Sequence, residues 1–147
     1  MSVDFDTANP PAAAARIAEL EQRIGHQLPA AYRRFLLQQD GGYIAAVNTE
    51  ALEEVFSVSQ SDPDYGQIWA YLGHMTDGSL PPGLLPVASD SEGNYFALSL
   101  RPGDEGSVWF VHHEAEQDDN GTITPIEITR KAASWPEFLA SVQPVDA

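Results

Sequence analysis

Residues 85–113 read LPVASDSEGNYFALSLRPGDEGSVWFVHH, and they carry the strongest signal of the fold class. Three runs within it are rich in β-branched and aromatic residues and predict strands at 85–88, 95–100 and 107–113. The segments between them are short and rich in glycine and aspartate, as turns are. Because a parallel connection needs a dozen or more residues, strands joined by such short turns must pair antiparallel.

The third of these strands should lie in the middle of the sheet. Successive side chains of a strand point to opposite faces. Trp109 and Val111 therefore share one face, and Val108 and Phe110 share the other, so both faces are apolar. The same residue types predict further strands at 43–47, 54–58 and 122–128.

Two short helices precede the strands. Ile17, Leu20 and Ile24 form the apolar stripe of the first helix, at helical spacing. We expect Asn9 to cap this helix and Gly25 to end it.

The second helix should open at Pro29, since proline fits the first turn of a helix. Tyr32, Phe35 and Leu36 would share its buried face, and the Gly41-Gly42 pair would end it. Because only a few residues join the two helices, we expect a helical hairpin with both stripes on the same sheet.

Two further helices complete the pattern. Ile68, Leu72 and Met75 predict a short middle helix. Ser134-Trp-Pro-Glu137 is a capping box, in which the serine hydroxyl and the glutamate carboxylate satisfy reciprocal backbone donors at the start of a closing helix.

Helices followed by mainly antiparallel strands and a last helix describe an α+β fold. We expect a single domain over residues 1–147, because ordinary domains contain roughly 100–200 residues. It should be a largely antiparallel sheet with an N-terminal helix hairpin, a middle short helix and a C-terminal helix packed on it. Residues 1–9 and 144–147 should be flexible ends.

The charge balance is strongly acidic. Seven Lys and Arg residues stand against 22 Asp and Glu residues, for a formal net charge of −15. Nucleic acids and anionic membrane surfaces both require clustered cations, so we expect neither as a partner. The charge instead favours attraction to a basic protein.

Cysteine is absent, which excludes a disulfide framework, thiol catalysis and cysteine-ligated metals and suits a reducing compartment. The N-terminal segment carries Asp4 and Asp6 where a secretory leader would carry cations. No stretch approaches the roughly 20 apolar residues that span a bilayer. We therefore expect a cytoplasmic protein.

The histidines are the main candidates for catalytic residues. His112 and His113 are neighbours in a predicted strand, so they should point to opposite faces and not share one metal. His113 beside Glu114 could serve as a general base. Against this hypothesis, the chain has neither a glycine-rich phosphate loop nor a nucleophile elbow. We expect no catalytic residue, no cofactor and no metal site.

One segment matches a calcium-loop pattern. Its matching positions are Glu116, Asp118, Asn120, Gly121, Ile123 and Glu127. The first position is Glu where the pattern has Asp, and the flanks predict strands where the pattern has helices. Asn120-Gly121 is also good hairpin chemistry, since both residues tolerate positive φ. We favour the hairpin.

Four blocks of sequence follow one another in a recognisable order. They are the helix pair from Ile17 to Gly42, then Leu85-Pro-Val-Ala88 with Asp90 and Gly93-Asn94, then Val108-Trp-Phe110 with His113-Glu114, and last Ser134-Trp-Pro-Glu-Phe-Leu139. Together they resemble the SUKH superfamily, the Smi/Knr-like domain. The chain departs from the usual pattern at His112, where an acidic residue is common, and at Glu92, where glycine is common.

The resemblance implies an α+β fold and a non-enzymatic protein-binding module. Bacterial members are mostly immunity proteins, which neutralise a cognate polymorphic toxin that is often a nuclease. Fungal members regulate cell-wall assembly as binding proteins. The resemblance carries over no catalytic residue.

Charge and resemblance together predict an immunity protein whose acidic surface occludes the active face of a basic toxin. A regulatory scaffold that binds a cellular partner is the alternative. The partner-binding candidates are the acids of the predicted turns: Asp62, Asp64, Asp90, Glu92, Glu114, Glu116, Asp118 and Asp119.

Overall fold

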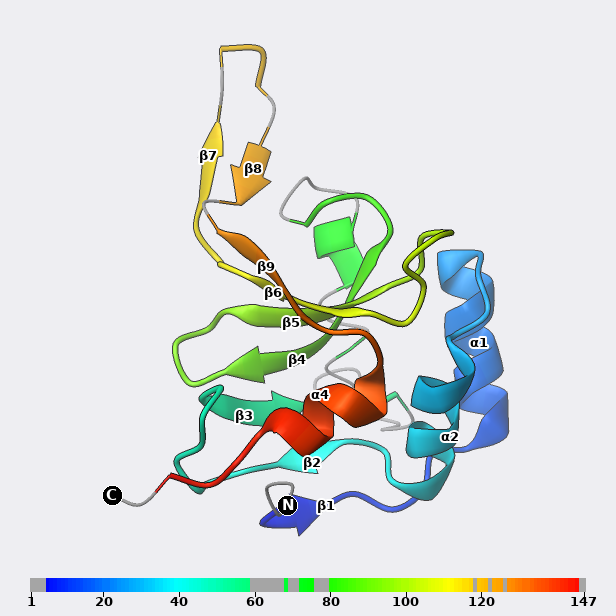
Figure 1. The fold of residues 1–147 in the computed structure, drawn as a ribbon. Helices are drawn as coiled ribbons and strands as arrows, with labels where there is room; N and C mark the ends of the chain where they lie inside the picture. The colour runs from blue at the N-terminus through cyan, green and yellow to red at the C-terminus, as the bar shows by residue number, and fades with distance from the viewer. Residues whose placement is uncertain are drawn as a thin grey trace.

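The fold is taken from a computed structural model. It describes residues 5–58, 68, 72–75, 80–117, 119–121, 123–125 and 127–145. Among these residues, seven strands form one antiparallel sheet in the order β1-β2-β3-β4-β5-β6-β9, and β7 pairs with β8 in a separate hairpin (Figure 1). The strands are β1 (Thr7–Ala8), β2 (Gly42–Tyr43), β3 (Leu52–Val55), β4 (Leu84–Asp90), β5 (Tyr95–Ser99), β6 (Val108–Val111), β7 (Ala115–Gln117), β8 (Ile123–Pro125) and β9 (Ile128–Ala132). The predicted α+β class is confirmed.

The described helical elements pack against this sheet. They are α1 (Ala14–Ile24), α2 (Ala30–Gln38), the 3₁₀ turn η1 (Leu72–Met75) and α4 (Trp135–Ser141). In Figure 1, α1 and α2 lie side by side beyond one end of the strands, and α4 lies across the front of the sheet. The predicted middle helix is seen only as η1 and the helical residue Ile68, and the rest of it is outside the described residues.

The start of α1 differs from the prediction, and its end agrees. The helix begins at Ala14 with Ala13 as its N-cap, and the Asn9 side-chain amide instead donates to the Asp40 carbonyl over 2.9 Å. Consecutive prolines at 10 and 11 explain the late start, because a residue that precedes proline avoids the helical conformation. Gly25 ends the helix at φ +71°, as expected.

α2 and α4 pack together through aromatic rings. The ring centroids of Tyr32 and Phe35 lie 5.3 and 5.5 Å from that of Trp135, both nearly edge-on. The Ser134 hydroxyl accepts from the Glu137 backbone N–H over 3.3 Å, which is the serine half of the predicted capping box.

The sheet is apolar on both faces, which confirms a central position for β6 between β5 and β9. Val108 and Phe110 join the main core beneath the helices. Val111 and Trp109 join a second cluster on the opposite face, together with Leu80. Alternate side chains of β6 therefore belong to two different apolar clusters, one on each face of the sheet, as the sequence predicts.

Several element boundaries differ from the predictions. Residues 44–51 form a loop where a strand was expected over 43–47. The strand predicted over 122–128 is divided between β8 and the start of β9, and β7 and most of β9 were not predicted. The described parts of the two ends, expected to be flexible, make backbone pairs: Thr7 with Tyr43, and Pro144 with Asn48.

Candidate protein-binding surface

Three connections meet at one end of the sheet, which we call the turn end: residues 44–51, 90–94 and 112–114. The pairing places them there, since Leu52 lies opposite Asp90, and Tyr95 lies opposite Val111. Figure 1 shows this end on the side away from α1 and α2. Connections far apart in sequence thus form one neighbourhood.

Asp90 organises the turn between β4 and β5. One carboxylate oxygen accepts from the backbone N–H groups of Glu92 and Asn94 over 2.9 and 2.8 Å, and the other accepts from the Asn94 side chain over 2.8 Å. The residue is only 7% exposed. Its carboxylate is therefore used inside the turn.

Asn94 joins this turn to the corner that follows β6. Its side-chain carbonyl accepts from the His113 backbone N–H over 3.0 Å and lies 2.6 Å from His113 Nδ1. Because a carbonyl oxygen only accepts, His113 Nδ1 carries the proton in this contact. The corner is thereby fixed to the neighbouring turn.

The two histidines do not point to opposite faces, so that prediction is wrong. β6 ends at Val111, and beyond it the rings of His112 and His113 stack with centroids 4.9 Å apart. His112 Nδ1 accepts from the Glu114 backbone N–H over 3.1 Å. Among the described residues no group of three or more His, Asp or Glu side chains is placed to hold a metal.

His113 and Glu114 do not form a catalytic pair in this arrangement. His113 Nε2 and Glu114 Oε1 are 4.0 Å apart, and both side chains are well exposed to solvent. A general base needs a substrate held within hydrogen-bond reach, in a place that shifts its protonation. Side chains this exposed at a solvated corner do not enclose a substrate.

The other predicted acids are distributed as follows. Glu92 and Glu114 are exposed at the turn end, and Asp119 is exposed in the β7–β8 turn. Glu116 lies in β7, while Asp62, Asp64 and Asp118 are outside the described residues. The structure thus brings Glu92 and Glu114 to one end of the sheet and places Asp119 on the hairpin.

The hairpin prediction for the calcium-like segment is confirmed. β7 and β8 pair antiparallel, with Gln117 opposite Ile123. Gly121 has φ +84°, the left-handed conformation that favours glycine in such turns.

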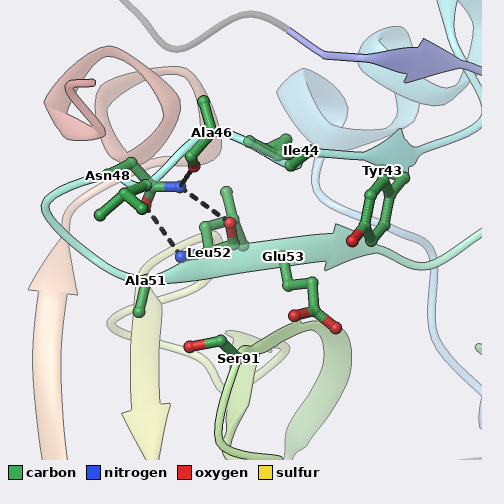
Figure 2. Close-up of a pocket in the computed structure, with 10 residues that line it drawn as sticks. Tyr43, Ile44, Ala46, Asn48, Ala51, Leu52, Glu53 and Ser91 are labelled. Carbon is green, nitrogen blue, oxygen red and sulfur yellow. Dashed lines mark hydrogen bonds between the residues drawn. The ribbon is translucent and has the colours of Figure 1, made fainter. Parts of the chain in front are cut away.

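Sequence reasoning missed the loop 44–51, which Asn48 organises. The Asn48 amide donates to the carbonyls of Ala46 and Leu52 over 3.0 and 2.9 Å, and its carbonyl accepts from the Leu52 N–H over 2.8 Å (Figure 2). The same carbonyl accepts from the Glu50 N–H over 3.2 Å. Asparagine in such bonds competes with strand pairing. Asn48 followed by Thr and Glu was the available sequence signal for a turn.

A pocket of about 120 Å³, the loop pocket, lies between this loop and β3. Its lining includes Tyr43, Ile44, Val47, Leu52, Glu53 and Ser91. Figure 2 shows Asn48 and the loop on one side of β3 and the side chains of Glu53 and Ser91 on the other. Ser91 belongs to the β4–β5 turn, so the pocket is continuous with the acidic turns.

Comparisons with known proteins agree with the fold. A model of the SMI1 / KNR4 family (SUKH-1) matches residues 11–141, which include every helix and all strands except β1. The chain is also similar to the SPbeta prophage-derived uncharacterized protein YokK of Bacillus subtilis (strain 168). The two are 24% identical over 155 aligned residues, covering 90% of this chain and 76% of the relative. Among the described residues, each helix is too short or too polar to cross a membrane.

Proposed function

Since the chain belongs to the SMI1 / KNR4 family (SUKH-1), whose members serve as immunity or regulatory binding proteins, we propose that it is an immunity protein. It neutralises a basic toxin by binding the toxin face that meets the substrate. The proposed function needs no bond-making by this chain, only a stable complex.

The observation that carries this proposal is the acidic turn end of a strongly acidic molecule. Exposed Glu92 and Glu114 extend from connections that hydrogen bonds hold in place, and the whole chain carries a net charge of −15. Glu116 and Asp119 lie on the adjoining hairpin. Asp90 is left out of the contact because its carboxylate is used within its own turn. Asp62, Asp64 and Asp118 stay sequence-based candidates.

Electrostatic attraction would act mainly on the rate of binding. Complementary potentials raise association rates above the roughly 10⁵–10⁶ M⁻¹s⁻¹ of neutral protein pairs. If the toxin is a nuclease, the carboxylates of this chain would occupy the positions that nucleic-acid phosphates occupy in the substrate complex. Inhibition would then be competitive with nucleic acid.

The test is binding to the protein encoded beside this chain's gene, by co-purification and by association kinetics at several salt concentrations. We expect Glu92→Lys/Glu114→Lys to slow association about tenfold at low salt, with the difference shrinking as salt increases. Glu105→Lys, a single charge reversal of the same kind, is the control, and its effect is compared with that of Glu92→Lys alone. Glu105 is exposed in the β5–β6 connection, at the opposite end of the strands, where it contacts His26.

Failure of the neighbouring gene product to bind would contradict the immunity function. If neither salt nor the reversal of both charges changes the association rate, the proposed contact through Glu92 and Glu114 is contradicted. If the neighbouring product does not bind but a cellular protein is bound with the same salt dependence, the regulatory scaffold replaces the immunity protein.

A further inference from the structure

We propose that the partner docks on a defined patch beside the loop pocket, the anchor face, made of Tyr43, Val47, Glu53, Glu54 and Val145. It takes an apolar side chain that is flanked by lysine or arginine on a basic partner protein. This inference rests on the proposed function and names where and how the partner is held.

The anchor face gathers most of the exposed large apolar side chains of the described residues. Val47 is 63% exposed, Val145 45% and Tyr43 44%. Val145 donates its backbone N–H to the Val47 carbonyl over 2.9 Å, so these two valines are neighbours although 98 positions separate them. Exposed apolar side chains that cluster mark binding sites more often than isolated ones do.

The face is held rigid before any partner arrives. Asn48 makes four hydrogen bonds, two within the loop and two to the backbone of Leu52 at the start of β3. The Thr49 hydroxyl accepts from the Gln143 backbone N–H over 3.0 Å, and this bond attaches the loop to the segment that follows α4. The Ser91 N–H donates to the Ala51 carbonyl over 2.9 Å, and this bond attaches the loop to the β4–β5 turn. A preformed site loses less conformational entropy on binding.

Carboxylates beside the apolar side chains select a cation. Tyr43 lies directly opposite Glu54 in the β2–β3 pair, and Glu53 is next to it. The pKa of the Glu54 carboxyl is raised, first by burial and then by repulsion from Glu53. Repulsion between these two acids falls when a partner's cation lies between them. The exposed Tyr43 ring offers the same cation a π face.

The size of the loop pocket argues against a small-molecule ligand, and the net charge argues against a second copy of this chain. A pocket of about 120 Å³ is far below the roughly 300 Å³ or more of small-molecule sites. One side chain of a protein partner fits this scale. A second copy of this chain would bring another net charge of −15 to the same surface. Like charges at an interface oppose association.

The experiment uses two short synthetic peptides, each lysine-rich, one with a central leucine and one with alanine in its place. Backbone amide shifts of the isotope-labelled full chain are followed during titration with each peptide. We expect the leucine peptide to bind at least five times more tightly and to shift the amides of residues 43–53. Salt should weaken the binding of both peptides.

Variants locate the contact. Tyr43→Ser/Val47→Ser should bring the affinity for the leucine peptide down to that for the alanine peptide, a loss of at least fivefold, and should weaken the alanine peptide less, through loss of the Tyr43 ring alone. Glu53→Gln/Glu54→Gln should weaken both peptides and reduce their salt dependence. Leu37→Ser is the matched control, since Leu37 is a similarly exposed apolar residue on α2. Thermal unfolding of each variant checks that the fold is intact.

Equal affinity for the two peptides, or amide shifts confined to residues outside 43–54, would overturn the anchor face. Concentration-dependent dimerisation of the free chain that Val47→Ser abolishes would also overturn it, because a second copy would then be the occupant. If the neighbouring gene product binds both the wild-type chain and Tyr43→Ser/Val47→Ser equally, the anchor face fails while the proposed function stands. If the leucine peptide binds as expected but that product does not, the immunity function fails alone.

Discussion

At the scale of single residues, Tyr32 offers the simplest test of the core. Its phenol is fully buried and has no hydrogen-bond partner among the described residues. Burial raises the pKa of the Tyr32 phenol, with a further contribution from the Asp40 carboxylate, so the group stays neutral. An unpaired buried hydroxyl costs about 1–3 kcal/mol. We expect Tyr32→Phe to raise the free energy of unfolding in urea by about 1 kcal/mol. A loss of stability would contradict the assignment of an unpaired hydroxyl.

Asp104 should make stability depend on pH. Its carboxylate accepts from the Ser99 hydroxyl and from Arg101, each over 2.6 Å. These contacts, the Ser99 bond first, lower the pKa of Asp104. Because the pKa of Asp104 is lowered in the folded state, its ionised carboxylate stabilises the fold. This contribution to the free energy of unfolding is complete above the usual pKa of about 4, and it is lost as the pH falls through the folded-state pKa.

Asp104→Asn should therefore cost up to about 1 kcal/mol at pH 7, because the pair is partly exposed, and this difference should disappear in strong acid. Urea unfolding across the acidic range measures it. Glu105→Gln is the control, and a difference between Asp104→Asn and wild type that persists at the lowest pH would contradict the prediction.

At the scale of elements, the loop 44–51 depends on one side chain. Asn48 is buried and holds four backbone groups, so Asn48→Ala leaves several of them unpaired. With about 1–3 kcal/mol for each buried group left unpaired, we expect a loss of at least about 2 kcal/mol. Hydrogen exchange at the amides of Glu50 and Leu52 should accelerate more than exchange in β5. Uniform acceleration across the sheet would show that Asn48 acts on the whole fold instead.

The closing helix α4 can be tested in the same way. Phe138 is fully buried, with its ring centroid 4.9 Å from that of Phe96 and 5.7 Å from that of Trp135. Phe138→Ala should cost about 3–5 kcal/mol in urea unfolding, because the cavity lies between a helix and the sheet. Leu139→Ala, at a half-buried neighbour, should cost clearly less. Equal losses of stability in Phe138→Ala and Leu139→Ala would show that Phe138 is not the main core contact of α4.

At the scale of the whole molecule, the net charge should act in opposite directions on folding and on binding. A charge of −15 repels itself in the compact state, and salt screens that repulsion. We expect the melting temperature of the free chain to rise by a few degrees from about 10 mM to about 300 mM NaCl, over which the Debye length falls from ~30 Å to below ~10 Å. Affinity for a basic partner should fall over the same range. A melting temperature that salt does not change would show that the acids are already balanced by local contacts.

The sequence alone determined the fold class, the apolar faces of α1 and α2, the central position of β6 and the serine cap of α4. These features depend on local periodicity and on turn and cap chemistry, which neighbouring residues carry. It also identified the acids but not their surroundings: Asp90 looked like a surface charge and is the buried centre of a turn.

The turn end and the anchor face depend on contacts between distant parts of the chain. Thr49 contacts Gln143 across 94 positions, and Val47 lies beside Val145. The stacking of His112 on His113 likewise depends on β6 ending one residue before them. Such neighbourhoods arise from which strands pair and in what register, a long-range choice that leaves little trace in the local pattern of residues.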